Sequence, residues 1–174
     1  EKTIRLPNHS FTFSAKIVGD TLFTHATSEV EKKYLTYAGS LEEPTQRVVY
    51  SVGAEKPNKI THLSTNKDHL ASVDFTNKVL KIFSTTNLEN LFDISLADMT
   101  APVGVNLISD GVLVTDLYGG KLCKYALSPT PRLLWTCTGL RGPSGVATDE
   151  SAMIYVTSVT TPRVYIISPN GKFS

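Results

Sequence analysis

The sequence contains few cysteines and no long apolar run, and these absences exclude several classes of protein. Its two cysteines are too few for a disulfide-rich scaffold. No apolar stretch approaches the roughly 18 residues that a membrane-spanning helix requires, no segment resembles a signal peptide, and helical periodicity is nearly absent. We therefore expect a folded domain with no membrane partner, either secreted or cytoplasmic.

Neither sign of charge is in excess. Lys and Arg number 17 and Asp and Glu number 16, which gives a formal net charge of +1. This balance disfavours a strongly basic nucleic-acid surface, although a local basic patch is compatible with it. With 174 residues, of which 41% are hydrophobic, the chain is long enough and apolar enough for one domain with a substantial core.

Two features bear on the compartment without deciding it. Cys123 and Cys137 lie in two consecutive predicted strands, so one cross-strand disulfide is an alternative to two buried reduced thiols. We favour the thiols, because cysteine is among the most buried residue types. Asn8-His9-Ser10 is a formal N-glycosylation acceptor, and such triplets also occur by chance.

Short runs rich in Val, Ile, Thr, Tyr and Phe alternate with Gly, Pro, Asn, Asp and Ser. This pattern is typical of strands and turns. Asp110-Gly111 stands between two apolar runs, and Asn170-Gly171 follows another near the C-terminus. Both dipeptides are strong hairpin signals. The sequence predicts an all-β protein.

The strands recur with a period near 40 residues. Pro102 and Gly104 align with Pro143 and Gly145, an offset of 41 residues. Repeats of this length with about four strands each are typical of β-propeller blades. We expect a single propeller domain of four blades of about 40–50 residues. Its modules are 11–55, 56–100, 101–141 and 142–174.

The last module has only three predicted strands. Residues 2–7 precede the first module and alternate like an outer strand. Added to the last module, this segment would complete the fourth blade and close the ring, which removes exposed sheet edges. We favour this closed four-bladed propeller. The alternative is a fragment or half of a larger, six-bladed type of propeller, and self-association of half-rings is then open.

The C-terminal modules contain "PSGVA" from Pro143, "RVYIISPNGKF" from Arg163, and Asp74 followed by Asn77 in a Val-Asp-x-x-Asn hairpin. With these motifs the chain resembles NHL repeats, mainly over residues 61–173. This resemblance implies a propeller that acts as a platform for protein or RNA ligands. A minority of related propellers are metal-assisted lyases or hydrolases.

The repeat alignment places His25, Asp74, Asp116 and Ser158 at equivalent corners of one face. We expect them at the mouth of the propeller channel, where loops form a recognition surface. The simplest role for such carboxylates is to cap turn amides or pair with a neighbouring basic residue. A second interpretation is a polar ligand or cation at the mouth. The candidate ligand-binding residues are His25, Asp74, Asp116, Tyr118, Ser158, Arg141 and Arg163.

We predict a non-catalytic binding scaffold that recognises a protein, glycan or other polar ligand. It needs no cofactor on this interpretation. The alternatives are a metal-dependent hydrolase or lyase with a divalent cation at His25, Asp74 and Asp116, and an RNA-binding NHL-type platform. The metal site requires three oxygen or imidazole ligands to converge. Net charge disfavours RNA, so a protein or glycan is the favoured partner.

Overall fold

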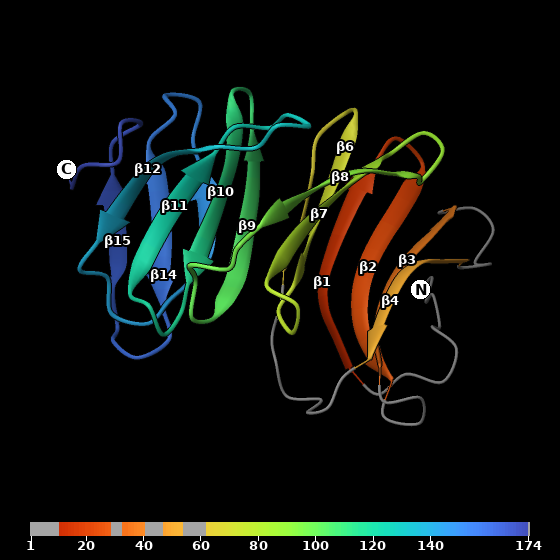
Figure 1. Ribbon diagram of the computed structural model, residues 1–174, viewed down its shortest axis with the longest axis horizontal. Helices are drawn as coiled ribbons and strands as arrows, with labels where there is room; N and C mark the ends of the chain where they lie inside the picture. Colours follow the sequence, from red (N-terminus) through yellow and green to blue (C-terminus); the bar gives the residue numbers. More distant parts are fainter. Residues whose placement is uncertain (1–10, 29–32, 41–46, 54–61, 174) are drawn as a thin grey trace, which may run out of the picture.

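The computed structural model describes residues 11–28, 33–40, 47–53 and 62–173. These residues form four antiparallel sheets (Figure 1). None of the described segments forms a helix with the length and hydropathy that a membrane crossing needs. The prediction of an all-β fold is confirmed.

Each sheet is a meander in which consecutive strands pair with one another. Sheet one contains β1 (Phe11–Val18), β2 (Thr21–Ser28), β3 (Lys33–Ser40) and β4 (Arg47–Gly53). Sheet two contains β5 (Leu63–Thr65), β6 (His69–Asp74), β7 (Val79–Ser84) and β8 (Asn90–Ser95). Sheet three contains β9 (Pro102–Ile108), β10 (Gly111–Asp116), β11 (Lys121–Tyr125) and β12 (Leu133–Thr138). Sheet four contains β13 (Pro143–Thr148), β14 (Ile154–Ser158) and β15 (Val164–Ile167).

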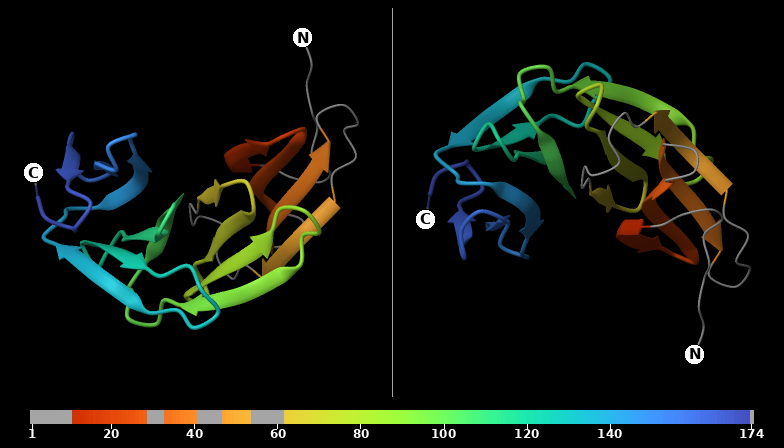
Figure 2. Two further views of the ribbon diagram at one scale, coloured as in Figure 1. Left: turned by 90° about the horizontal axis from the view of Figure 1, so that it is seen from above. Right: turned by 90° about the horizontal axis from the view of Figure 1, so that it is seen from below.

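The four sheets follow one another around an axis like the blades of a propeller, and they form an open arc (Figure 2). Sheets one and four lie at the two ends of that arc. The first strands β5, β9 and β13 lie on its inner side (Figure 2), and β9 contacts both β5 and β13. The predicted closing strand, residues 2–7, lies outside the described residues, so ring closure stays a prediction. The open arc is also consistent with part of a larger ring.

Three apolar clusters hold the arc together, one between each pair of successive sheets. Phe23, Leu70 and Phe83 belong to the cluster between sheets one and two. The other two clusters share sheet three between them. Because side chains alternate between the two faces of a strand, a sheet that is covered on both faces needs apolar residues at successive positions. β10 meets this demand and is buried at every residue.

The register of sheet three settles the relation between the two cysteines. Cys137 lies opposite Leu122, whereas Cys123 lies opposite Thr136. Neighbouring residues of a strand point to opposite faces, so Cys123 joins the cluster with sheet two and Cys137 the cluster with sheet four. Both are free and buried thiols, and burial raises the pKa of each. A disulfide between them is incompatible with this arrangement.

Candidate functional site: the hairpin rim

Three hairpins that join the second and third strands of sheets two, three and four lie at the same end of the strands. The corners of these hairpins are Asp74, Asp116 and Ser158. Lys78 O accepts a hydrogen bond from Leu96 N at 2.8 Å, and Gly120 O accepts the equivalent bond from Leu140 N at 3.0 Å. The hairpins of sheets two and three are therefore tied to the segments that lead into the next sheet. We call these connected segments, residues 74–78, 96–101, 116–120, 139–142 and 158–163, the hairpin rim.

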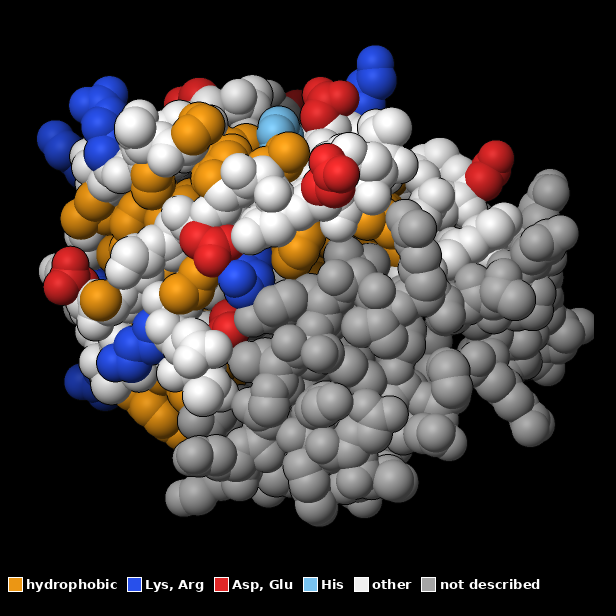
Figure 3. Space-filling view, turned by 45° about the vertical axis from the view of Figure 1, so that its right-hand side comes forward, with side chains coloured by type: hydrophobic (Ala, Val, Ile, Leu, Met, Phe, Trp, Pro, Cys, Tyr) orange, Lys and Arg blue, Asp and Glu red, His pale blue; other side chains and the backbone are white. Residues whose placement is uncertain are grey.

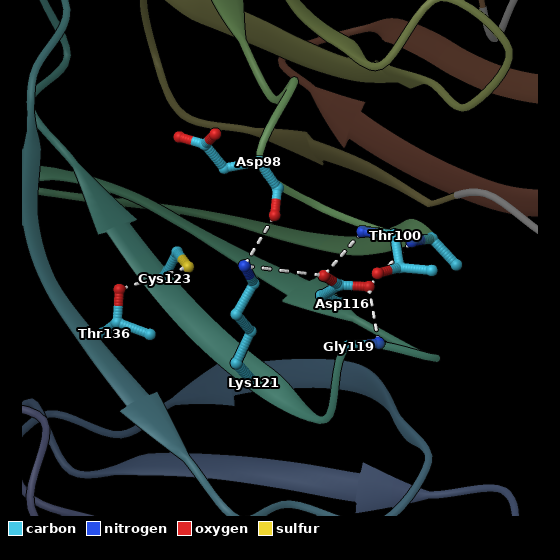
Figure 4. Close-up of polar contacts among 8 residues, drawn as sticks. Asp98, Thr100, Asp116, Gly119, Lys121, Cys123 and Thr136 are labelled. Carbon is cyan, nitrogen blue, oxygen red and sulfur yellow. Dashed lines mark hydrogen bonds and ion pairs between the residues drawn. The ribbon is translucent and has the colours of Figure 1, made fainter.

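Asp116 is the most buried corner, with no exposed surface. Its carboxylate accepts hydrogen bonds from three backbone N–H groups (Figure 4). The donors are Thr100 at 2.8 Å, Ala101 at 2.7 Å and Gly119 at 2.9 Å. Two of them belong to the segment that enters sheet three, and the third belongs to the hairpin itself. One carboxylate thus fixes two loops against each other.

The chain around Asp116 is shaped to bring donors close to it. A Cβ atom at Gly119 would lie 2.1 Å from a carboxylate oxygen of Asp116, so the hairpin can approach only with glycine there. Lys121 lies 3.8 Å from the same carboxylate and donates a hydrogen bond to the Asp98 carbonyl at 2.7 Å. Hydrogen bonds from backbone N–H groups to a charged carboxylate such as that of Asp116 are roughly twice as strong as hydrogen bonds between neutral groups. The oxygens of Asp116 are therefore already engaged by the protein.

Asp74 occupies the corresponding corner of sheet two and is 2% exposed. Its carboxylate accepts from the backbone N–H of Asn77 at 3.0 Å and from the Asn77 side-chain amide at 2.9 Å. Asn77 and Gly119 stand at the same distance along the chain from their carboxylates. The carboxylate of Asp74 therefore closes its own turn, as an Asx turn does.

Ser158 plays this part in sheet four through a hydroxyl group. Its Oγ donates to the Arg141 carbonyl at 2.6 Å and accepts from the backbone N–H of Thr161 at 3.0 Å. The hydroxyl of Thr161 also donates to it at 2.8 Å. Sequence analysis aligned Ser158 with the two aspartates without identifying this bond to the preceding segment.

Of the remaining candidate residues, three lie on the rim and one, His25, lies on sheet one. Tyr118 is 77% exposed at the tip of the Asp116 hairpin, and Arg141 and Arg163 are also exposed. The Arg141 backbone N–H donates to the Tyr165 hydroxyl at 2.8 Å, which fixes the segment that carries its side chain. His25 lies on β2 opposite Ser14 and Thr36, and its side chain lies outside the described part of the chain.

Asp116 joins its hairpin to the segment that enters sheet three, and Asp74 accepts hydrogen bonds from Asn77 of its own hairpin. Among the side chains that the structure describes, no group of three or more His, Cys, Asp or Glu residues could hold a metal ion. The predicted metal site also includes His25, so it stays untested. The described part of the rim is an ordered set of loops. The aromatic ring of Tyr118 and the guanidinium groups of Arg141 and Arg163 project from it.

A second feature, which sequence analysis missed, lies at the opposite end of the strands. A cleft of about 360 Å³ separates sheets three and four, with Ile108, Asp110 and Lys124 on one wall and Thr148, Asp149 and Glu150 on the other. Lys124 is 7% exposed and its Nζ lies 2.6 Å from an Asp110 oxygen. The Asp110-Gly111 hairpin signal was visible in the sequence. The lysine is recognisable only once β10 and β11 are paired.

Comparison with known proteins identifies the fold. No protein-family model and no curated protein matches the sequence. Among solved structures, the chain resembles virginiamycin B lyase from Staphylococcus aureus with 9% identity and a TM-score of 0.74, covering 100% of this chain and 58% of that one. It also resembles the glutaminyl cyclase of Myxococcus xanthus (16% identity, TM-score 0.62, covering 95% and 69%). A third similar structure is BamB from Moraxella catarrhalis (14% identity, TM-score 0.58, covering 83% and 39%).

The chain spans little more than half the length of most of the solved structures that it resembles. These structures are β-propellers, and they include enzymes as well as other proteins. At identities this low, a shared fold does not carry a shared function. The geometry and the comparisons together establish that the described residues of this chain form β-propeller blades.

Proposed function

We propose that this chain is a non-catalytic binding scaffold whose hairpin rim recognises a protein partner. The observation that carries the proposal is that different residues of the rim order its loops and project from them into solvent. Asp74, Asp116 and Ser158 are engaged in ordering the loops, whereas Tyr118, Arg141 and Arg163 project from the ordered loops into solvent. Tyrosine and arginine are enriched among the residues that dominate protein–protein binding energy.

Rigid loops favour such a role. The rim segments are joined by backbone hydrogen bonds, including Val159 N to Gly142 O at 2.9 Å and Leu117 N to Ala101 O at 2.8 Å. Loops that are ordered before binding lose less conformational entropy when a partner arrives. Val159 adds an apolar side chain, 63% exposed, to the same rim. An apolar and aromatic surface flanked by arginines suits a partner with acidic and apolar side chains.

The NHL resemblance supports a platform function, and we retain NHL-type repeats as part of the proposal. Between protein and RNA, charge supports protein. The net charge is +1, and on the face drawn in Figure 3 acidic and basic side chains are interspersed over the coloured part of the surface. An RNA platform is expected to concentrate basic side chains along a groove.

The proposal can be tested with peptides selected from a random displayed library on the immobilised chain. We expect the selected peptides to bind in solution titrations. Tyr118→Ala should weaken that binding by about 10-fold or more, the scale expected for a binding hot spot, and Arg141→Ala and Arg163→Ala should weaken it less. Because all three side chains are exposed, the melting temperature should not change. Glu150→Gln, in the cleft, is the matched control. Peptides whose binding is unchanged by all three rim variants would contradict the proposal.

The cleft between sheets three and four supports a second candidate, the binding of a small polar ligand. Its volume of about 360 Å³ falls within the range of ordinary ligand sites. Three carboxylates and a buried lysine line it together with apolar side chains such as Ile108 and Ile154. The ligand would thus carry charged or hydroxyl groups on a compact apolar frame. Thermal shifts with a panel of amines and polyols, repeated on Glu150→Gln, would detect it.

A further inference from the structure

A buried hydroxyl group of sheet three binds the backbone of sheet four. Thr115 is fully buried, and its Oγ1 accepts a hydrogen bond from Gly104 N at 2.9 Å and donates one to Ser144 O at 2.7 Å. A Cβ atom at Gly104 would lie 1.9 Å from that same carbonyl oxygen. Glycine and threonine thus act together, since one makes room for the neighbouring strand and the other binds its backbone.

The carbonyl group that Thr115 binds occupies a recurrent position. Between sheets two and three, His62 N donates to Val103 O at 3.0 Å. Val103 and Ser144 are equivalent residues of the repeat, because each follows the proline that begins its inner strand. In both interfaces the preceding sheet therefore donates a hydrogen bond to the same carbonyl of the sheet that follows.

Sheet four carries the same pair of residues on its far face. Gly145 and Thr157 are equivalent to Gly104 and Thr115, and Gly145 N donates to Thr157 Oγ1 at 3.0 Å. The Thr157 hydroxyl has only a long contact of 3.5 Å to Gly145 O, and Thr157 is exposed whereas Thr115 is buried. The threonine hydroxyl that sheet three uses to bind sheet four therefore has an equivalent in sheet four, and this equivalent is exposed.

Apolar side chains surround Thr157 on this face. The register pairs Thr157 with Val164 and Tyr155 with Ile166, and cross-strand partners point to the same side of a sheet. Val164 is 57% exposed and Ile166 is 45% exposed. We call Gly145, Tyr155, Thr157, Val164 and Ile166 the receiving face. Sheet four ends the described arc, and no described sheet covers this face (Figure 2).

We infer that the receiving face binds a second copy of this chain through the face of its first sheet that points away from sheet two. Sheet one packs Phe23 and Ala38 against sheet two. Its opposite face carries Ile17, which is 59% exposed and lies opposite Leu22 in the register. Every interface within the arc joins the far face of one sheet to the near face of the next. A second copy provides a near face of this kind, with an inner strand whose backbone carbonyl can accept from Thr157.

Each arc carries one receiving face and one matching face on its first sheet. If the rotation between two copies closes, both contacts form and the result is a symmetric dimer. If it does not close, the same contact extends into a chain of copies. In either case the docking contact is the same, and it depends on the Thr157 hydroxyl and on the apolar surface around it. The five residues of this surface differ from Tyr118, Arg141 and Arg163 of the hairpin rim, and Val164 directly follows Arg163.

Sedimentation equilibrium of the full chain over a range of concentrations tests the inference. We expect self-association, with a dimer at twice the 19.0 kDa of the chain or a ladder of its multiples. Ile166→Lys should weaken association by at least about 10-fold, because it places an unpaired charge in an apolar contact. Thr157→Val should weaken it less, through loss of one hydrogen bond. Thr138→Val changes an exposed threonine of β12, outside the receiving face, and is the matched control.

Circular dichroism melts of each variant would establish that the fold is intact, as expected for substitutions at exposed positions. A wild-type chain that stays monomeric at every accessible concentration would overturn the inference. So would an oligomer that Ile166→Lys and Thr157→Val leave unchanged. An oligomer that both variants weaken, and that Thr138→Val does not, would support it.

Discussion

The hairpin corners of sheets three and four occupy the same place in the repeat but use different chemistry. At Asp116 a carboxylate with no exposed surface binds three backbone N–H groups. At Ser158 a partly exposed hydroxyl donates to one carbonyl and accepts from the following turn. In both sheets the side chain joins the hairpin to the segment that enters the sheet. What the two corners share is therefore a connection between loops rather than a particular functional group.

The difference between the corners follows from their surroundings. Sheet three is covered on both faces and the Asp116 side chain has no exposed surface, so the buried backbone N–H group of Ala101 must find its acceptor within the protein. Of the sheets that the structure describes, only sheet three covers sheet four, and water can complete the hydrogen bonds of the partly exposed Ser158 corner. The two corners should consequently respond very differently to the same kind of substitution.

The largest effect is expected from Asp116→Ala. This change removes the acceptor of three backbone N–H groups, of which that of Ala101 is buried and those of Thr100 and Gly119 are partly buried, and we expect the free energy of unfolding to fall by about 3 kcal/mol. Urea denaturation followed by circular dichroism would measure it. Asp98→Ala is the control, because only the backbone carbonyl of Asp98 binds Lys121. A loss below about 1 kcal/mol would show that Asp116 does not organise the rim.

Ser158→Ala should cost about 1 kcal/mol, because water can replace the lost hydroxyl at this partly exposed corner. The same denaturation experiment would measure the loss. Ser151→Ala, in another turn of sheet four, provides the comparison for a serine whose backbone N–H rather than its hydroxyl is engaged by Asp149. If the two corners proved equally sensitive, the contrast between buried and solvated connections would have to be abandoned.

The smallest effect is expected at the ends of the hairpins, where sheets two and three differ. Lys78 has a φ of 51° and the equivalent Gly120 has a φ of 62°, a conformation that favours glycine. Lys78→Gly should therefore raise the free energy of unfolding by about 0.5–1 kcal/mol, measured as an upward shift in melting temperature.

Gly120→Ala is the converse change and should destabilise the protein. Its φ is unfavourable for alanine, and its Cβ atom would lie 2.7 Å from the Leu140 carbonyl oxygen. If Lys78→Gly lowered stability while Gly120→Ala did not, the two hairpins would not share the equivalence inferred from the repeat.

Periodicity predicted the equivalence of the corners because it depends on local spacing. The alignment of Pro102 with Pro143 set the frame, and Asp74, Asp116 and Ser158 followed from it. His25 was predicted at the equivalent corner of sheet one, but it lies within β2 rather than at its end. The partners of these residues were harder to predict. Asp116 binds Thr100 and Ala101, which requires the end of β10 to meet a segment that precedes β9. The burial of Lys124 beside Asp110 likewise depends on strand pairing.

The sequence by itself determined the all-β class, the repeat and the equivalent positions within it, because strand alternation and turn chemistry act over a few residues. Only the tertiary structure decided that Cys123 and Cys137 face different clusters, that the aspartates are engaged by backbone amides, and that Thr115 is buried while Thr157 is exposed. These outcomes depend on which sheet covers which face. Equivalent positions of the repeat take different roles when one face is packed and the other is open, because burial decides whether a hydroxyl or an apolar side chain already has its partner.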